Sequence, residues 1–200
     1  KTTGASRAED VLILRSEKQA LGRSREANPN ARVVTVSSTD ELAGVRDWLV
    51  QRVFANGVPR EGAPRFVVLD SVTDFCRMVS DHIERDGGKE GDWGYRQWNR
   101  YKQACIRMVR QFRDLPTTLV GLFLDEVSRG DEGGLGARRM AVGMKTMAPH
   151  VAALFDLVLW SEVMDRGDEG VVYALRTTGG VYRGNLLEQG KGHPNLGKWV

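Results

Sequence analysis

The chain has 200 residues, of which 41% are hydrophobic, and its formal net charge is +3 at pH 7. This is the length of one domain with a sizeable core, and the composition excludes an intrinsically disordered chain. Because no apolar run approaches the roughly 20 residues of a membrane span, we expect no membrane partner. Cys76 and Cys105 lack the spacing of zinc ligands, so we expect reduced thiols in a cytoplasmic protein, with a disulfide between them as the alternative.

The first part of the chain alternates between short apolar runs and amphipathic segments. Apolar runs without polar alternation predict strands that are buried on both faces, as in a parallel sheet. They occupy residues 11–14, 33–36, 66–70 and 119–124. Apolar residues at three- and four-residue intervals predict helices between these runs. The predicted helices cover residues 39–53, capped by Thr39 or Asp40, then 71–85, as a helix or a helical turn, and 98–115.

Two stretches rich in glycine and charge, residues 86–95 and 129–145, predict mobile loops, the second running into the start of the next helix. The elements expected around and after them are a helix at 140–154 broken near Pro149, a strand at 155–160, and a hairpin of residues 171–177 and 181–188. Strands that alternate with helices predict an α/β fold. We therefore expect a mainly parallel sheet flanked by helices, with a C-terminal antiparallel hairpin.

Asp70 is the strongest single candidate for a chemical role. It ends the apolar run 66–70, and open α/β sheets bind ligands at the carboxyl ends of their strands. Ser71 and Thr73 add polar groups at the same edge of the sheet. A strand-end cap or an ion-pair partner is the alternative role for Asp70.

The chain begins with Lys1-Thr2-Thr3. A Lys followed by Thr ends a phosphate-binding loop, whose Lys reaches the β- and γ-phosphates and whose hydroxyl holds Mg²⁺. Such a loop needs glycines before its Lys, because backbone N–H groups must approach the phosphates closely. We therefore expect a sequence truncated inside the loop, the alternative being that Lys1 is an ordinary terminal residue. Together with Asp70, this motif predicts a nucleotide triphosphatase.

Further carboxylates follow other predicted strands. Glu17 lies just past the run 11–14, where it could orient or deprotonate the attacking water of a hydrolysis reaction. A solvated loop residue is the alternative role for Glu17. Asp125 and Glu126 follow the run 119–124 and offer another polar contact near a γ-phosphate, although Asp125 could equally be a surface residue.

Three of these segments resemble motifs of the RecA-type recombinases. Residues 11–21 (VLILRSEKQAL) resemble the strand and following segment that carry the catalytic Glu of that family. Residues 67–72 (VVLDSV) resemble its Walker B strand, and Lys1-Thr2-Thr3 is similar to the end of its Walker A motif. The motifs are individually loose, but they occur in the order of the family along nearly the whole chain.

Other segments resemble the phage-borne RecA-like ATPases, a short-form group linked to phage recombination and single-strand annealing. They are Asp92-Trp93-Gly94, the long helix that follows, Asp114-Leu115-Pro116, and Phe155-Asp156. The chain departs from the family pattern at two places, one linked to the coupling of nucleotide state to DNA and one to the nucleotide of a neighbouring subunit. Asp125-Glu126 stand where RecA has a Gln, and Lys191-Gly192-His193 stand where phage-type proteins often have Lys-Asp-Arg.

The resemblance implies a single RecA-like P-loop domain over residues 1–200 that hydrolyses ATP with Mg²⁺. It implies that Lys1 holds the β- and γ-phosphates, that Thr2 and Asp70 hold the metal, and that Glu17 positions the attacking water. Thr3 would also contact the nucleotide, and Lys191 would reach the nucleotide of a neighbouring subunit or remain a solvated tail residue. The protein would self-associate as a ring or filament in the cytoplasm of a bacterium or of a phage-infected host.

The two predicted loops occupy the places of the DNA-binding loops of RecA-like proteins. We expect Trp93 to stack on a base of single-stranded DNA, and Arg138, Arg139 and Lys145 to contact phosphates. The expected function is therefore DNA-stimulated ATP hydrolysis in phage-type recombination or annealing. The alternative is a nucleotide-binding structural, assembly or regulatory protein with the same fold and little turnover.

Overall fold

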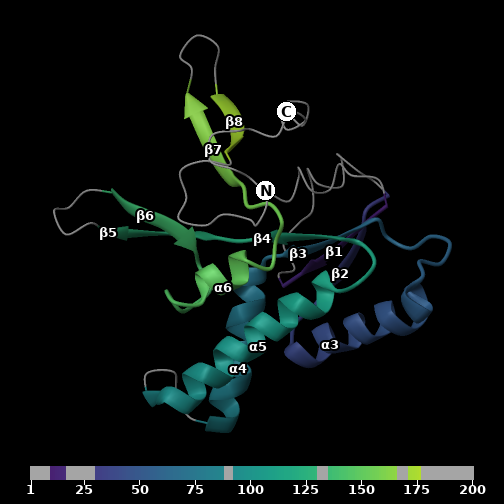
Figure 1. Ribbon diagram of the computed structural model, residues 1–200, viewed down its shortest axis with the longest axis horizontal. Coiled ribbons are helices and arrows are strands. Elements are labelled where there is room, and N and C mark those ends of the chain that lie inside the picture. The colour runs from purple at the N-terminus through teal and green to yellow at the C-terminus, as the bar shows by residue number, and fades with distance from the viewer. Residues whose placement is uncertain (1–9, 17–29, 88–91, 130–134, 166–170, 177–200) are drawn as a thin grey trace. The chain divides into compact units, whose positions relative to one another are not determined.

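The computed structural model describes residues 10–16, 30–87, 92–129, 135–165 and 171–176 (Figure 1). The chain divides into two compact units. The first holds residues 1–124 and 141–147, and the second holds residues 125–140 and 148–200. No helix in the described part of the chain is long and apolar enough to cross a membrane.

The first unit contains a four-stranded parallel sheet, with strand order β2-β1-β3-β4. The strands are β1 (Val11–Arg15), β2 (Arg32–Thr35), β3 (Phe66–Asp70) and β4 (Thr118–Leu122). The inner strands β1 and β3 are almost fully buried, with Ile13, Leu14 and Val68 at 0% exposure. This burial confirms the mainly parallel α/β fold that uninterrupted apolar runs predict.

The outer strands differ from the prediction in their burial. β4 ends at Leu122 and its residues are half-buried or exposed, although the run 119–124 predicts a fully buried strand. β2 is similarly half-buried. Both lie at the edges of the described sheet, where a strand has only one described neighbour to cover it.

Helix α3 (Thr39–Trp48) follows β2, and its cap lies one residue before the predicted Thr39 and two before the predicted Asp40. Its cap is Ser38, whose Oγ accepts a hydrogen bond from the backbone N–H of Glu41 at 3.2 Å. The Glu41 carboxylate in turn accepts bonds from the backbone N–H and hydroxyl of Ser37, at 2.7 and 2.8 Å. This reciprocal arrangement satisfies backbone donors that the first helical turn leaves open.

After Trp48 the helix widens into a π-helical turn, η1 (Leu49–Val53), and a short 3₁₀ turn, η2 (Ala55–Gly57), precedes the loop to β3. The next helices are α4 (Val72–Gly87) and α5 (Tyr95–Arg113), which pack against each other. In Figure 1, α3, α4 and α5 lie on the same side of the sheet. Helices α4 and α5 confirm the helices predicted at 71–85 and 98–115.

The buried faces of α4 and α5 bring two cysteines together. Cys76 and Cys105 are free thiols with 1% and 0% exposure. A hydrogen bond with Cys105, together with burial, raises the pKa of the Cys76 thiol well above its ordinary value. A thiol whose pKa is raised in this way is a poor nucleophile, so the pair belongs to the packing between the helices.

The second unit holds two antiparallel strand pairs and a short helix. One pair is β5 (Asp125–Arg129) with β6 (Leu135–Met140), and the other is β7 (Trp160–Asp165) with β8 (Val171–Arg176). The helix is α6 (Ala148–Ala152). β8 confirms the strand predicted at 171–177, but its described partner is β7, and the predicted partner at 181–188 lies outside the described residues.

Several predictions for this unit are wrong. Residues 135–140 form strand β6 where a mobile loop over 129–145 was expected, and the register sets Glu126 opposite Arg139. Asp125 and Glu126 were expected at the end of the strand at 119–124, but they are the first residues of β5. The helix expected at 140–154 is confined to α6, and the strand expected at 155–160 begins only at Trp160.

Candidate functional site

The candidate site lies at the carboxyl edge of the sheet, between β1 and β3. From β1 the chain passes to β2 on one side, whereas from β3 it passes to β4 on the other side. The carboxyl ends of two adjacent strands whose connections diverge in this way form the crevice where open α/β sheets bind ligands. Strand order alone therefore points to the ends of β1 and β3, at Ser16 and Asp70.

Asp70 is the last residue of β3 and is half-buried. It pairs in register with Arg15, and its backbone carbonyl accepts a hydrogen bond from the backbone N–H of Ser16 at 3.2 Å. This bond ties the end of β1 to the end of β3. Because the backbone is held on both strands, the carboxylate of Asp70 is presented from a rigid part of the sheet.

Ser16 is a residue that the sequence analysis did not single out. Its Oγ is buried, and no group in the described part of the chain forms a hydrogen bond with it. A buried hydroxyl without a partner is costly in a native protein and needs an explanation. It is placed one residue before Glu17 and hydrogen-bonded through its backbone to Asp70, so a polar ligand at this edge would satisfy it.

The two hydroxyls that follow Asp70 already have structural partners. Ser71 Oγ donates to the carboxylate of Asp74, whose other oxygen accepts a bond from Arg77 at 2.9 Å. Thr73 is 3% exposed, and its Oγ1 accepts a hydrogen bond from the backbone N–H of Leu124 at 3.1 Å. These hydroxyls fix the first turn of α4 against the strand end, so they hold Asp70 in place from its carboxyl side.

Most of the other predicted site residues cannot be compared with the structure. Lys1, Thr2, Thr3, Glu17 and Lys191 lie outside the described residues. Arg138 and Arg139 belong to β6, and their side chains are not described. Lys145 is exposed in the turn before α6.

Trp93 is placed differently from the prediction. It is 8% exposed and packs in a ring cluster with Trp98, at 5.0 Å between ring centroids, and with Tyr101, at 5.9 Å. A buried ring that packs edge-on against Trp98 and at a tilt against Tyr101 leaves little of its face to a nucleic-acid base. The expectation that Trp93 stacks on DNA is therefore corrected. The aromatic side chain of this segment that solvent reaches is Tyr95, at 86% exposure.

The same cluster anchors the segment that returns to the first unit after β6. The Tyr101 hydroxyl donates a buried hydrogen bond to the backbone carbonyl of Val142 at 2.9 Å. Gly143 follows with φ +81°, and a Cβ on it would lie 2.5 Å from the Tyr101 hydroxyl oxygen. Only glycine fits this close approach, because an L side chain is strained at that φ and would also collide with the tyrosine.

Replacing Gly143 with Ala is therefore expected to destabilise the fold by about 1–3 kcal/mol, from backbone strain and the contact with Tyr101. At Gly62 φ is +72° and nothing lies within 4 Å of an added Cβ, so Gly62→Ala introduces the backbone strain without a collision. It should therefore lower the free energy of unfolding by less than Gly143→Ala does. In a Tyr101→Phe background the hydroxyl is absent, so Gly143→Ala should cost less than in the wild type. Urea unfolding of the four variants of this cycle gives the coupling, and strictly additive costs would contradict the contact.

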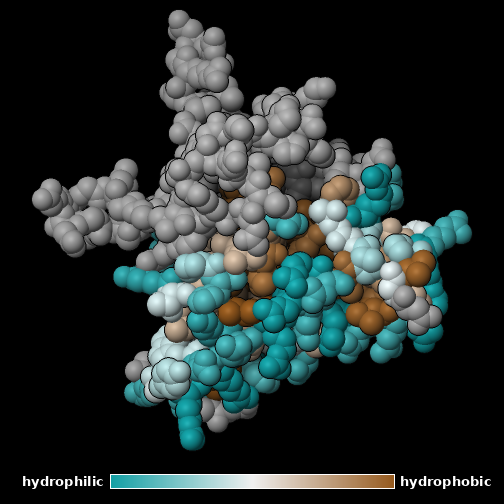
Figure 2. Space-filling view, viewed as in Figure 1, coloured by the Kyte–Doolittle hydropathy of each residue, from teal (hydrophilic) through white to brown (hydrophobic). Residues whose placement is uncertain are grey.

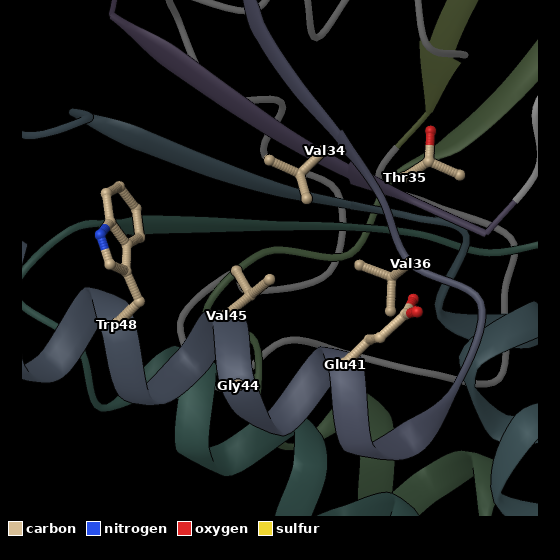
Figure 3. Close-up of a pocket in the computed structure, with 7 residues that line it drawn as sticks. All are labelled: Val34, Thr35, Val36, Glu41, Gly44, Val45 and Trp48. Carbon is tan, nitrogen blue, oxygen red and sulfur yellow. The ribbon is translucent and has the colours of Figure 1, made fainter.

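A separate hollow of about 440 Å³ lies between β2 and α3 (Figure 3). Its lining is apolar apart from Thr35 and Glu41, and Figure 3 shows Val45 and Trp48 on the helix side facing Val34 on the strand side. It includes neither Ser16 nor Asp70. Because its lining contains no Lys or Arg and includes the acidic Glu41, this hollow is a poor site for a triphosphate.

The comparison with protein families agrees with the geometry at the carboxyl edge. The model of a family described as an AAA domain matches residues 1–185. The chain belongs to this AAA-domain family. The match includes every helix and strand of the AAA domain described above, as well as Lys1, Glu17 and Asp70. No curated protein and no solved structure matches the chain.

Membership of the family supports nucleotide binding and a general nucleoside triphosphatase activity, for which Mg²⁺ is the usual metal. The residues of this AAA domain fit both groups. Asp70 would supply a carboxylate oxygen, the hard donor that Mg²⁺ prefers, and Ser16 would supply a buried hydroxyl that has no hydrogen-bond partner among the described residues. No three His, Cys, Asp or Glu side chains of the described residues gather into an all-protein metal cage. A single carboxylate beside substrate phosphates is how proteins usually hold Mg²⁺.

Proposed function

We propose that the chain is the RecA-like core of a Mg²⁺-dependent ATPase that acts on single-stranded DNA in phage-type recombination or annealing. The observation that carries the proposal is the position of Asp70, at the end of a doubly buried strand and beside the strand that leads into Glu17. P-loop triphosphatases hold Mg²⁺ with an Asp of this kind and orient the attacking water with a separate residue.

The roles of the residues follow from their chemistry. Lys1 binds the β- and γ-phosphates as a point charge, and Thr3 adds a contact to the nucleotide. The Thr2 hydroxyl and the Asp70 carboxylate would hold the metal. Glu17 orients the attacking water and accepts its proton. Mg²⁺ bound with ATP neutralises charge that develops on the phosphates.

Two parts of the proposal extend beyond one nucleotide site. Lys191 reaches the phosphates of the neighbouring subunit, so the active oligomer is a ring or filament. Single-stranded DNA is contacted from the start of α5 and from the β5–β6 region. Tyr95 replaces Trp93 as the stacking residue, with Arg138, Arg139 and Lys145 at phosphates.

The assay that tests this function measures ATP hydrolysis by the full-length protein, with Mg²⁺ or EDTA, and with or without a single-stranded oligonucleotide. We expect Mg²⁺-dependent turnover that rises when the oligonucleotide is added. Turnover that DNA does not affect would remove the DNA part of the proposal. ATP binding without turnover would favour the second candidate, a nucleotide-binding assembly or regulatory protein, to which the loss of the RecA Gln at Asp125-Glu126 also points.

Tyr95→Ala is expected to weaken binding of single-stranded DNA roughly 5- to 150-fold, because stacking of one base on an aromatic ring contributes about 1–3 kcal/mol. The side chain is 86% exposed, so its removal leaves the core intact. Trp48→Ala, which removes another exposed aromatic ring far along the sequence, is the matched control. Fluorescence anisotropy of a labelled oligonucleotide measures both. Equal affinities for wild type and Tyr95→Ala would exclude the stacking role.

A further inference from the structure

Helix α5 carries a stripe of arginines that the proposed site does not use. Arg96, Arg100, Gln103, Arg107 and Arg110 follow one another at intervals of four, three, four and three residues. Residues at these intervals lie on one face of a helix. At a rise of 1.5 Å per residue, the stripe is about 21 Å long. We call these five residues the arginine stripe.

The arginine stripe lies opposite the buried face of the helix. The buried residues of α5 are Tyr101, Cys105, Met108, Val109 and Phe112, which are centred on the other side of the helical wheel. All five members of the stripe are exposed. Figure 2, which has the same view as Figure 1, shows a hydrophilic surface over α5.

No acid neutralises the stripe from within the helix, since α5 contains neither Asp nor Glu from Tyr95 to Arg113. Arg100 interacts with other groups of the protein. By contrast, no hydrogen bond or ion pair within the described part of the chain engages the side chains of Arg96, Arg107 or Arg110. The exposed charged residues of the packed helix α4 are Arg77, Asp81 and Arg85, and its half-buried acids are Glu84 and Asp74, the latter paired with Arg77.

We propose that the arginine stripe binds the sugar–phosphate backbone of single-stranded nucleic acid along α5. Guanidinium groups form forked hydrogen bonds with phosphate oxygens, and a row of cations some 21 Å long spans several successive phosphates. The stripe starts beside Tyr95, whose 86% exposed ring is available to an unpaired base. The pairing of a cationic track with an aromatic platform is how proteins hold single strands without reading their sequence.

This inference rests on the proposed action on single-stranded DNA but adds a contact surface to it. The stripe continues along α5 for several turns past the segment before the helix. A strand bound there would therefore follow the long axis of α5 and extend beyond Tyr95.

The test compares two triple variants of the full-length protein, Arg96→Gln/Arg107→Gln/Arg110→Gln and the control Arg52→Gln/Arg60→Gln/Arg65→Gln. The control removes three exposed arginines elsewhere in the same unit, so the net charge of the two variants is equal. Binding of a labelled oligothymidylate is titrated between 50 and 200 mM salt, and thermal unfolding confirms that each variant is folded. A lysine variant, Arg96→Lys/Arg107→Lys/Arg110→Lys, separates charge from forked hydrogen bonding.

Three phosphate contacts to a single strand contribute about 2 to the slope of log affinity against log salt. We expect the stripe variant to lose on the order of 100-fold in affinity at 0.1 M salt and to show a slope shallower by about 2. The control should keep the wild-type slope. The lysine variant should keep the slope and lose part of the affinity.

Wild-type affinity and slope in the stripe variant would overturn the inference while leaving the proposed function in place, as would equal losses in the stripe variant and the control. Absence of oligonucleotide binding by the wild type would overturn both, and the ATPase assay without DNA would then show whether the nucleotide site survives. Binding of the wild type to vesicles of phosphatidylserine and phosphatidylcholine, or to polyglutamate, without binding to the oligonucleotide would assign the stripe to a different partner and overturn the inference.

Discussion

Asp70→Asn is expected to abolish Mg²⁺-dependent ATP hydrolysis, lowering turnover by about 100-fold or more, while the fold stays intact. Asparagine has nearly the same shape as aspartate, and the backbone bond from Ser16 to the carbonyl of residue 70 does not depend on the side chain. The substitution removes the negative charge that favours the metal at the end of β3. Loss of activity with retained stability is therefore the signature of a metal-binding carboxylate.

The control for this change is Asp81→Asn, which neutralises an exposed carboxylate on α4. It should leave turnover unchanged. Titration of Mg²⁺ at fixed ATP shows whether activity returns in Asp70→Asn at high metal concentration, as expected for weakened metal binding. Wild-type turnover in Asp70→Asn at low Mg²⁺ would show that Asp70 is a strand-end residue without a role in the reaction.

Glu17→Gln is expected to retain ATP binding and to slow hydrolysis by on the order of 10²–10⁴-fold, which is the usual loss when a general base is removed. Glutamine keeps the size of the side chain and can still hydrogen-bond to water, but it cannot take up the proton. The position follows Ser16 directly, and Ser16 is hydrogen-bonded to Asp70 at the carboxyl edge of the sheet.

Binding of a fluorescent ATP analogue and single-turnover hydrolysis separate the two effects in Glu17→Gln. Glu61→Gln, at an exposed loop position, serves as the control. If Glu17→Gln hydrolyses ATP at the wild-type rate, Glu17 is a loop residue and another carboxylate, such as Glu126, positions the water.

The inner strands and the long helix of this protein could be predicted from the sequence, because the apolar pattern of each fits only one type of secondary structure. A run such as residues 66–70 has no polar face, so it must be buried on both sides, and this placed Asp70 at a strand end. The apolar spacing of α5 fits only a helix, and Pro116 explains why the helix ends nearby. These features depend on local pattern alone.

Features that depend on partners distant in sequence were not predictable in this way. β6 contains Gly136 and two arginines and has little strand propensity of its own, so only its pairing with β5 defines it. Trp93 follows a glycine-rich stretch that resembles an exposed loop, yet it packs against Trp98 and Tyr101. The hydrogen bond from Tyr101 to Val142 joins residues 41 positions apart.

In the candidate site, too, one residue could be predicted from the local sequence and another could not. The carboxylate at Asp70 was visible in the sequence, because the apolar run that precedes it marks the edge of the sheet. The hydroxyl of Ser16, which lacks a hydrogen-bond partner in the described part of the chain, was not visible, because its burial and its neighbour on β3 appear only when β1 and β3 are placed side by side. The strand order that makes this edge a binding crevice is likewise a property of the folded chain.

The most direct test of the nucleotide site is hydrogen–deuterium exchange of the full-length protein, measured with and without Mg²⁺ and a non-hydrolysable ATP analogue. We expect slower exchange on nucleotide binding at the end of β1, around Ser16, and at the junction of β3 and α4, from Asp70 to Asp74. The hollow between β2 and α3 should be unaffected. Protection confined to residues 34–48, or no protection at Ser16 and Asp70 under saturating nucleotide, would contradict the placement of the site.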